Sequence, residues 1–233
     1  MYSPLHASRL YEQVINQIEA LIQEGKLRAG DRLPAERELS EQFGVSRTVV
    51  REAVKALREK GLVQIQPGKG TYITDGTSEV MRQSISLMVK IDQRKGLANL
   101  MQVREMLEPE IAAIAARYAA AEELEEMKSA IEAMDEALED AEAYIEADQQ
   151  FHHTLAKAAN NELILRLIDP IVDLLREQRI QVFYAGSGGA ENGQIHHKQI
   201  FDAIQNGDSE AARQAMIAHL KQVRRDSGVT TAD

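Results

Sequence analysis

A predicted helix over residues 141–159 carries side chains with metal-binding chemistry on its apolar face. Asp148 and His152 lie four residues apart, so they share one helix face with Phe151 and Leu155. A carboxylate among core side chains is costly unless it is paired, hydrogen-bonded or bound to a metal. The spacing therefore indicates that this face does more than pack.

Two further histidines follow the same pattern on two other predicted helices. His197 shares a face with Ile200, and His219 shares a face with Met216. Three imidazoles and one carboxylate suit a divalent transition metal, for which zinc is the usual choice and nickel or manganese are alternatives. The competing interpretation is that these histidines are separate, satisfied members of the core.

Two of the candidate ligands have a histidine as neighbour. His153 follows His152, and His196 precedes His197. One residue along a helix is a rotation of about 100°, so each neighbour should face away from the site. We predict His197 rather than His196 as the ligand because His197 aligns better with Ile200.

The N-terminal part shows a second chemistry, that of nucleic-acid recognition. Predicted helices over 35–42 and 47–60 are separated by Gly44, which tolerates the left-handed backbone that ends a helix. Ser46 can cap the second helix with its hydroxyl. The first turns of that helix carry Arg47, Thr48 and Arg51. Cations there oppose the helix dipole, whereas DNA phosphates and guanine edges would match them.

A predicted β-hairpin follows these two helices. Residues 62–65 and 71–74 are β-rich and flank the turn QPGKG at 66–70, which has Lys69 near its tip. Helix, turn, helix and hairpin in this order predict a winged helix. A plain helical hairpin with solvated arginines is the alternative.

The first 75 residues resemble the DNA-binding domain of the GntR family of bacterial transcription regulators. The resemblance is carried by GKLRAGDRLPAEREL at 25–39, VSR at 45–47, VREA at 50–53 and GKGT at 68–71. It implies DNA contacts from an arginine of the first motif helix and two of the recognition helix, Arg37, Arg47 and Arg51. Further contacts are implied for Ser46, Thr48, Gly68 and Lys69.

Composition narrows the class of protein. The chain has 233 residues, enough for two modest domains, and no cysteine, so disulfide and thiolate chemistry are excluded. No apolar run approaches the roughly 20 residues of a membrane span and no signal pattern begins the chain, so we expect a cytoplasmic protein. Residues 1–75 carry a net charge of +1 within a chain of net charge −10. Such a balance argues against an indiscriminate nucleic-acid binder and for specific, salt-sensitive binding.

Helical patterns fill the rest of the chain. We predict a mostly α protein with a winged helix-turn-helix domain at 1–75, a connector at 76–96 that contains a helix at 79–91, an all-α bundle at 97–228 and a frayed tail at 229–233. The bundle should have about six helices, with kinks or breaks at two prolines and a glycine-rich loop at 185–193. The predicted helices span 97–120 (with Pro109), 121–138, 141–159, 162–184 (with Pro170), 194–205 and 209–225.

The helix at 97–120 has an apolar stripe and an internal charge pair. The stripe is Leu100, Val103, Leu107, Ile111 and Ile114. Arg104 lies four residues before Glu108, a spacing that by itself predicts an ordinary ion pair on the helix surface.

The C-terminal part resembles the FCD ligand-binding domain of the FadR subfamily. The resemblance is carried by DxxFHxxL at 148–155, Asn161, HxxI at 197–200, His219 with Leu220, and RxxLE at 104–108. It implies that Asp148, His152, His197 and His219 hold a metal. It also implies that Arg104 faces an effector cavity, with Asn161 as a second effector residue, and that the effector is a small carboxylate or a sugar acid.

Together these features predict a ligand-responsive transcription regulator without catalytic residues. We expect a homodimer that binds a pseudo-palindromic DNA operator. The resemblance to the GntR family implies repression that the ligand relieves. One alternative is a metalloenzyme that carries a DNA-binding domain, although nothing in the sequence selects Glu108 or Glu110 as a general base. The other is a constitutive DNA binder with a structural metal.

Overall fold

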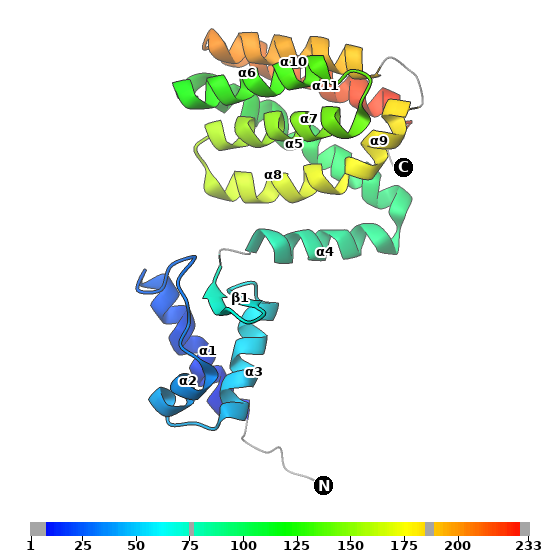
Figure 1. Cartoon of the computed structure of the whole chain (residues 1–233). Coiled ribbons are helices and arrows are strands. Elements are labelled where there is room, and N and C mark those ends of the chain that lie inside the picture. Colours follow the sequence, from blue (N-terminus) through cyan, green and yellow to red (C-terminus); the bar gives the residue numbers. More distant parts are fainter. Residues whose placement is uncertain (1–7, 75–76, 185–188, 229–233) are drawn as a thin grey trace. The chain divides into compact units, whose positions relative to one another are not determined.

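The chain divides into two compact units, with the boundary after Met81. Figure 1 shows the computed structural model, which describes residues 8–74, 77–184 and 189–228. The predicted class is confirmed: a winged helix-turn-helix unit precedes an all-α unit. The predicted domain boundaries at residues 75 and 96 stay a prediction, and the predicted frayed tail lies outside the described residues.

Among its described residues the N-terminal unit contains three complete helices and a two-stranded antiparallel sheet, and it ends within the following helix, α4 (Thr77–Ile91). Gly44, with φ of 66°, ends α2, and Ser46 Oγ accepts a hydrogen bond from the Val49 amide at the start of α3, as predicted. The strands pair in register from Val63 opposite Ile73 to the tight turn at the tip. The elements are α1 (Ser8–Gln23), α2 (Glu36–Phe43), α3 (Arg47–Glu59), β1 (Val63–Gln66) and β2 (Gly70–Ile73).

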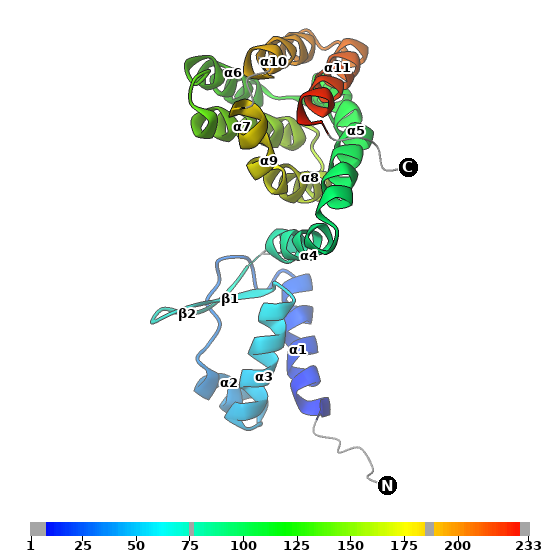
Figure 2. The same ribbon diagram turned by 90° about the vertical axis from the view of Figure 1, so that its right-hand side faces the viewer.

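The second unit is a helical bundle in which α7 lies against α5, α6, α8 and α9. Figure 2 gives a view nearly along the bundle, with α5 beside α11 and α6 beside α10. The helices are α4 (Thr77–Ile91), α5 (Gln93–Tyr118), α6 (Ala121–Glu136), α7 (Ala141–Ala158), α8 (Glu162–Leu174), α9 (Arg176–Tyr184), α10 (Gly189–Gln205) and α11 (Ser209–Ser227).

The core of the bundle follows from the apolar stripes of its helices. Phe151 and Leu155 of α7 are buried against Ile200 of α10, Met216 of α11 and Met134 of α6. Burial of each such side chain contributes about 1.5–3 kcal/mol relative to an exposed one. Because Asp148, His152, His197 and His219 lie on the same helix faces as these residues, the packing of the core brings them together.

Neither proline breaks its helix. Helix α5 continues through Pro109 and helix α8 continues through Pro170, and the predicted kinks at these prolines stay predictions. The predicted helix 162–184 is instead divided at Leu175, whose amide bonds to the Val172 carbonyl in a tightened last turn. The Leu175 side chain is fully buried there. The helix therefore ends where a leucine is packed into the core and not at the proline, which lacks an amide hydrogen. With this break the bundle has seven described helices after α4.

The predicted loop 185–193 was also wrong in its second half, because α10 begins at Gly189. Gly193 is buried inside this helix, and a Cβ there would lie 3.1 Å from the Tyr144 hydroxyl. That hydroxyl donates a 3.0 Å hydrogen bond to the Ala190 carbonyl. The glycine thus serves a close approach between α10 and α7, which sequence alone does not distinguish from a turn. Within the described residues, no helix combines the length and hydropathy of a membrane span.

Candidate functional site

Three histidines from three helices converge in the core of the bundle. His152 of α7, His197 of α10 and His219 of α11 each present a ring nitrogen, and these nitrogens lie within 4.8 Å of one another. The ring centroids of His197 and His219 are 4.5 Å apart. Asp148, one turn before His152 on α7, places Oδ1 3.2 Å from His197 Nε2 and Oδ2 3.7 Å from His152 Nε2. The four predicted metal ligands therefore form one buried group.

Nδ1 of His152 and Nδ1 of His197 each lie beside another buried polar side chain. Nδ1 of His197 lies 3.3 Å from Gln194 Oε1, and Gln194 in turn donates to the Ile131 carbonyl at 2.7 Å. Nδ1 of His152 lies 2.9 Å from Glu108 Oε2. The acceptor beside Nδ1 of His197 favours a proton there, whereas Nδ1 of His152 lies at ion-pair distance from Glu108 without hydrogen-bond geometry. Metal-binding histidines are held by the same kind of outer partner.

The protonation states of the cluster suit a cation. Burial lowers the pKa of His197, and burial together with the neighbouring imidazoles lowers the pKa of His219 well below its ordinary value, so both rings are neutral. Burial acts to raise the pKa of Asp148, but Arg179 and the histidines outweigh it and hold that pKa well below its ordinary value. Nδ1 of His219 is buried and has no hydrogen-bond partner in the part of the chain that the structure describes. Neutral imidazoles, a carboxylate and a ring nitrogen without a partner fit a divalent transition metal.

Neither competing histidine is fully buried with this group, although the ring centroid of His196 lies 6.4 Å from that of His219. His153 is half-buried and pairs with Asp169, with 2.9 Å between Nδ1 and Oδ2. His196 lies 3.2 Å from Gln199 on its own helix. The structure therefore brings together the set that contains His152 and His197.

Arg104 and Glu108 of α5 form a second buried layer beside the histidines. Both side chains are 1% exposed, and the guanidinium pairs with both carboxylate oxygens. Nη2 of Arg104 also lies 3.4 Å from His152 Nε2. The alternative of an ordinary surface pair does not hold, because both side chains are buried. The placement of Leu107 in the apolar stripe was wrong, since Leu107 is exposed. The buried face of α5 runs through Arg104 and Glu108 instead.

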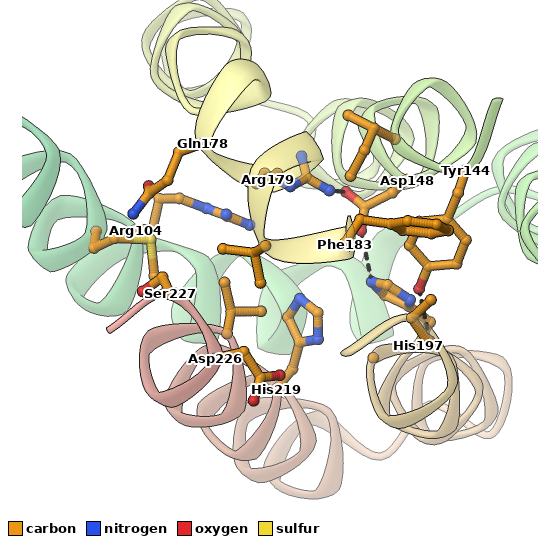
Figure 3. Close-up of a pocket in the computed structure, with 16 residues that line it drawn as sticks. Arg104, Tyr144, Asp148, Gln178, Arg179, Phe183, His197, His219, Asp226 and Ser227 are labelled. Atoms are coloured by element: carbon orange, nitrogen blue, oxygen red, sulfur yellow. Dashed lines mark hydrogen bonds and ion pairs between the residues drawn. The ribbon is translucent and has the colours of Figure 1, made fainter. Parts of the chain in front are cut away.

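A cavity of about 70 Å³ lies next to the histidine cluster. Its wall contains Asp148, His197, His219 and two arginines, Arg104 from α5 and Arg179 from α9. Figure 3 shows Arg104 reaching in from one side and the Arg179 guanidinium directed at Asp148, with His219 below them. Arg104 thus lies where the resemblance implied.

The other predicted effector residue lies elsewhere. Asn161 is exposed, and its side-chain oxygen accepts hydrogen bonds from the Leu163 and Ile164 amides as the cap of α8. It is not among the residues that line the cavity. Its side chain is therefore engaged in starting a helix, which an asparagine before an apolar run would have indicated.

Sequence reasoning missed Arg179. Its guanidinium forms an ion pair with Asp148 Oδ2, and its side chain is 11% exposed. Helix α9 has no apolar stripe and no fully buried residue that could have marked one of its arginines as inward-facing. Only the fold places this residue in the cavity wall.

The predicted DNA-contacting residues of the helix-turn-helix are exposed. Arg37 lies on α2, and Arg47 and Thr48 lie in the first turn of α3. Ser46 is exposed as well, although its hydroxyl also caps α3. Among the described residues, no ion pair occupies Arg37 or Arg47, so their charge is available to a phosphate or a base.

Arg51 is the one of these arginines with a protein partner. Its Nε and Nη2 donate to Glu36 Oε2 of α2 at 3.3 and 3.1 Å. Both side chains are well exposed. The pair fixes the direction of the Arg51 side chain without burying it.

The wing tip is a tight turn that exposes its cation. Gly68 has φ of 73°, a left-handed backbone that favours glycine, and Lys69 beside it is exposed. The Lys69 amide closes the turn on the Gln66 carbonyl at 3.0 Å.

Two family models match the chain one after the other. Residues 10–73 match the family described as bacterial regulatory proteins, gntR family, and residues 99–222, more than half of the chain, match the FCD domain. The chain belongs to the GntR family of bacterial transcription regulators. The expected resemblance is thereby confirmed, and DNA binding and transcription regulation are the function of this family.

Individual relatives agree over nearly the whole length of this GntR-family regulator. The HTH-type transcriptional regulator LutR of Bacillus subtilis (strain 168) is 33% identical over 207 residues, which are 87% of this chain and 94% of that one. The HTH-type transcriptional repressor NanR of Enterobacter sp. (strain 638) is 32% identical over 225 residues, which are 94% and 86% of the two chains. The solved structure of Streptococcus agalactiae GntR matches with a TM-score of 0.74 and 27% identity over 92% of this chain and 99% of that one.

Proposed function

We propose that this regulator binds a pseudo-palindromic operator as a homodimer and is switched by a small carboxylate or sugar acid bound beside a divalent metal. Repression relieved by the ligand is the proposed direction, in line with the repressor names of several relatives. Its domains in this proposal are a DNA-binding domain at 1–75, a helical connector at 76–96 and an effector- and metal-binding domain at 97–228.

The observation that carries the proposal is the buried set of Asp148, His152, His197 and His219 beside a cavity with arginines in its wall. These four residues would hold the metal, most plainly zinc, with nickel and manganese as alternatives. When bound, the metal supplies a Lewis acid to which a carboxylate or hydroxyl oxygen can bind. Arg104 offers a guanidinium to the same ligand, since planar guanidinium donors match carboxylate oxygens.

The DNA-binding part of the proposal rests on the exposed face of the winged helix. Arg37, Arg47, Thr48 and Arg51 would contact the major groove and its phosphates, with Ser46 at the start of the recognition helix. Gly68 and Lys69 of the wing would contact the DNA backbone. Two such heads in a dimer match an operator with two half-sites.

The homodimer is supported by apolar side chains that α4 leaves uncovered. Leu87, Met88 and Ile91 are each more than 60% exposed, and Met106 of α5 is 63% exposed. Several large apolar side chains exposed on neighbouring turns of one helix indicate a protein–protein interface. Light scattering on the purified chain should give twice the chain mass, and Met88→Glu should shift it toward the monomer.

A gel-shift titration tests the proposed switch. Operator DNA is first selected from a random pool with the zinc-loaded protein, and its affinity is then measured with and without each acid of a panel. A ligand can change DNA affinity only if it binds the two states of the protein differently. One acid should weaken operator binding by about tenfold or more. If zinc binds and stabilises the bundle but no acid changes DNA affinity, the metal is structural and the DNA binding constitutive, whereas turnover of the acid would indicate an enzyme.

A further inference from the structure

Arg179 has more hydrogen-bonding capacity than the protein satisfies. Nη2 forms an ion pair with Asp148, whereas Nη1 is buried and has no hydrogen-bond partner within the described residues. A guanidinium carries five N–H donors, and donors left unmade in a low-dielectric site are costly. The arrangement therefore leaves a binding capacity unused at this position.

The side chain of Arg179 belongs to the cavity wall rather than to the apolar core. It lies on the side of the cavity formed by α9, and Figure 3 shows its guanidinium next to Asp148 and across the cavity from Arg104. Two other residues with side-chain oxygens, Asp226 and Ser227, line the cavity from the end of α11. Asp226 already accepts a hydrogen bond from Gln222. An oxygen from a molecule in the cavity is the partner that fits the free donor.

Asp148 links Arg179 to the proposed metal. Its Oδ1 faces His197 and its Oδ2 faces Arg179, so the arginine and the histidine cluster lie on two sides of one carboxylate. A cation held by the histidines would add positive charge on the other side of Asp148 from the guanidinium. Two such cations in a buried site favour an anion that contacts both.

We propose that Arg179 binds the acid group of the effector, so that a carboxylate in the cavity contacts both the metal and the Nη1 group of Arg179. The inference rests on the proposed function and adds a residue that determines specificity for an anion. It also places the contact on α9, a short helix separated from α8 by the turn at Leu175. Effector binding would thus involve α9, a helix of the cavity wall that has no fully buried residue.

Calorimetry with the zinc-loaded full chain tests this assignment. The probes are acetate, propionate and glycolate, together with propionamide and glycolamide, which are neutral matches of the last two acids. The variants are Arg179→Gln and Arg179→Lys, with Arg176→Gln as the matched control, because Arg176 lies on the same helix but does not line the cavity. Zinc content is measured on every variant.

Arg179→Gln should lower the affinity for the acid by about tenfold or more, the effect of one charge-assisted hydrogen bond, and should leave the amide nearly unchanged. Arg179→Lys should restore part of the preference for acid over amide, and Arg176→Gln should behave like the wild type. Zinc content should be equal in all four proteins. Equal acid affinity in Arg179→Gln, an equal loss of acid and amide, or a loss of zinc would overturn the assignment. A wild-type protein that binds none of the acids would instead count against the proposed function itself.

Discussion

Glu108 should stabilise the bundle strongly although it contributes no apolar surface. Burial acts to raise its pKa, but Arg104 and His152 outweigh burial and lower the pKa to about 2, from 4.5. A decrease of that size corresponds to about 3 kcal/mol of folding stability. Because the folded-state pKa is the lower one, this stability is present above about pH 4.5 and is lost as the pH falls toward 2. Replacement by glutamine removes this stabilisation and leaves the buried Arg104 without its countercharge, and about 3 kcal/mol is at the lower end of the roughly 3–5 kcal/mol that breaking a buried pair costs.

The test is chemical unfolding of Glu108→Gln at pH 7, monitored by circular dichroism. A chelator is present throughout so that metal binding does not add to stability. Glu110→Gln is the matched control, since Glu110 lies on the same helix and pairs with Arg213 on the surface. We expect a loss of about 3 kcal/mol for Glu108→Gln and a far smaller loss for the control. Since Glu108 also holds His152, zinc affinity should fall by about 10–100-fold in this variant alone. Equal stabilities of the two variants would refute the reasoning that the pair is a buried and essential one.

Three further predictions concern single side chains. His197→Ala should lose the metal and His196→Ala should keep it, which elemental analysis of both purified variants decides; the reverse result would reassign the ligand. Arg47→Ala or Arg51→Ala should weaken operator binding in a gel-shift without lowering the melting temperature, and unchanged DNA affinity would refute the major-groove assignment. Asp169→Asn should lower the pKa of His153, which its hydrogen bond to Asp169 raises against the opposing effect of burial. In the wild type the pair should add less than about 1 kcal/mol. This stability should be present below about pH 6.5 and lost as the pH rises through the raised pKa. An NMR titration that finds the same His153 pKa in both proteins would contradict it.

The sequence was informative where periodicity and chemistry coincide. Asp148 and His152 are one turn apart on a helix whose other inward positions are apolar, so their meeting with His197 and His219 follows from helical geometry and core packing. The winged helix was likewise predictable, because Gly44, Ser46 and the turn at 66–70 each have a local conformational reason for their position.

The sequence was uninformative where tertiary packing decides. Gly193 looks like a loop residue, yet it lies inside α10. A glycine stands there because the Tyr144 hydroxyl approaches the helix closely. Leu107 looks like a core residue, but the face of α5 that turns inward carries Arg104 and Glu108, whose charges cancel each other. Arg179 is one of three arginines between residues 166 and 179, and only the break at Leu175 turns it toward Asp148.

The most direct test of the account measures operator affinity and zinc content together on the wild type and on the variant Asp148→Asn. We expect about one zinc per wild-type chain, and an acid that weakens DNA binding only when zinc is present. We expect Asp148→Asn to bind operator as tightly as the wild type but to lose the response to the acid. A wild-type protein without zinc that still responds to the acid would contradict the account.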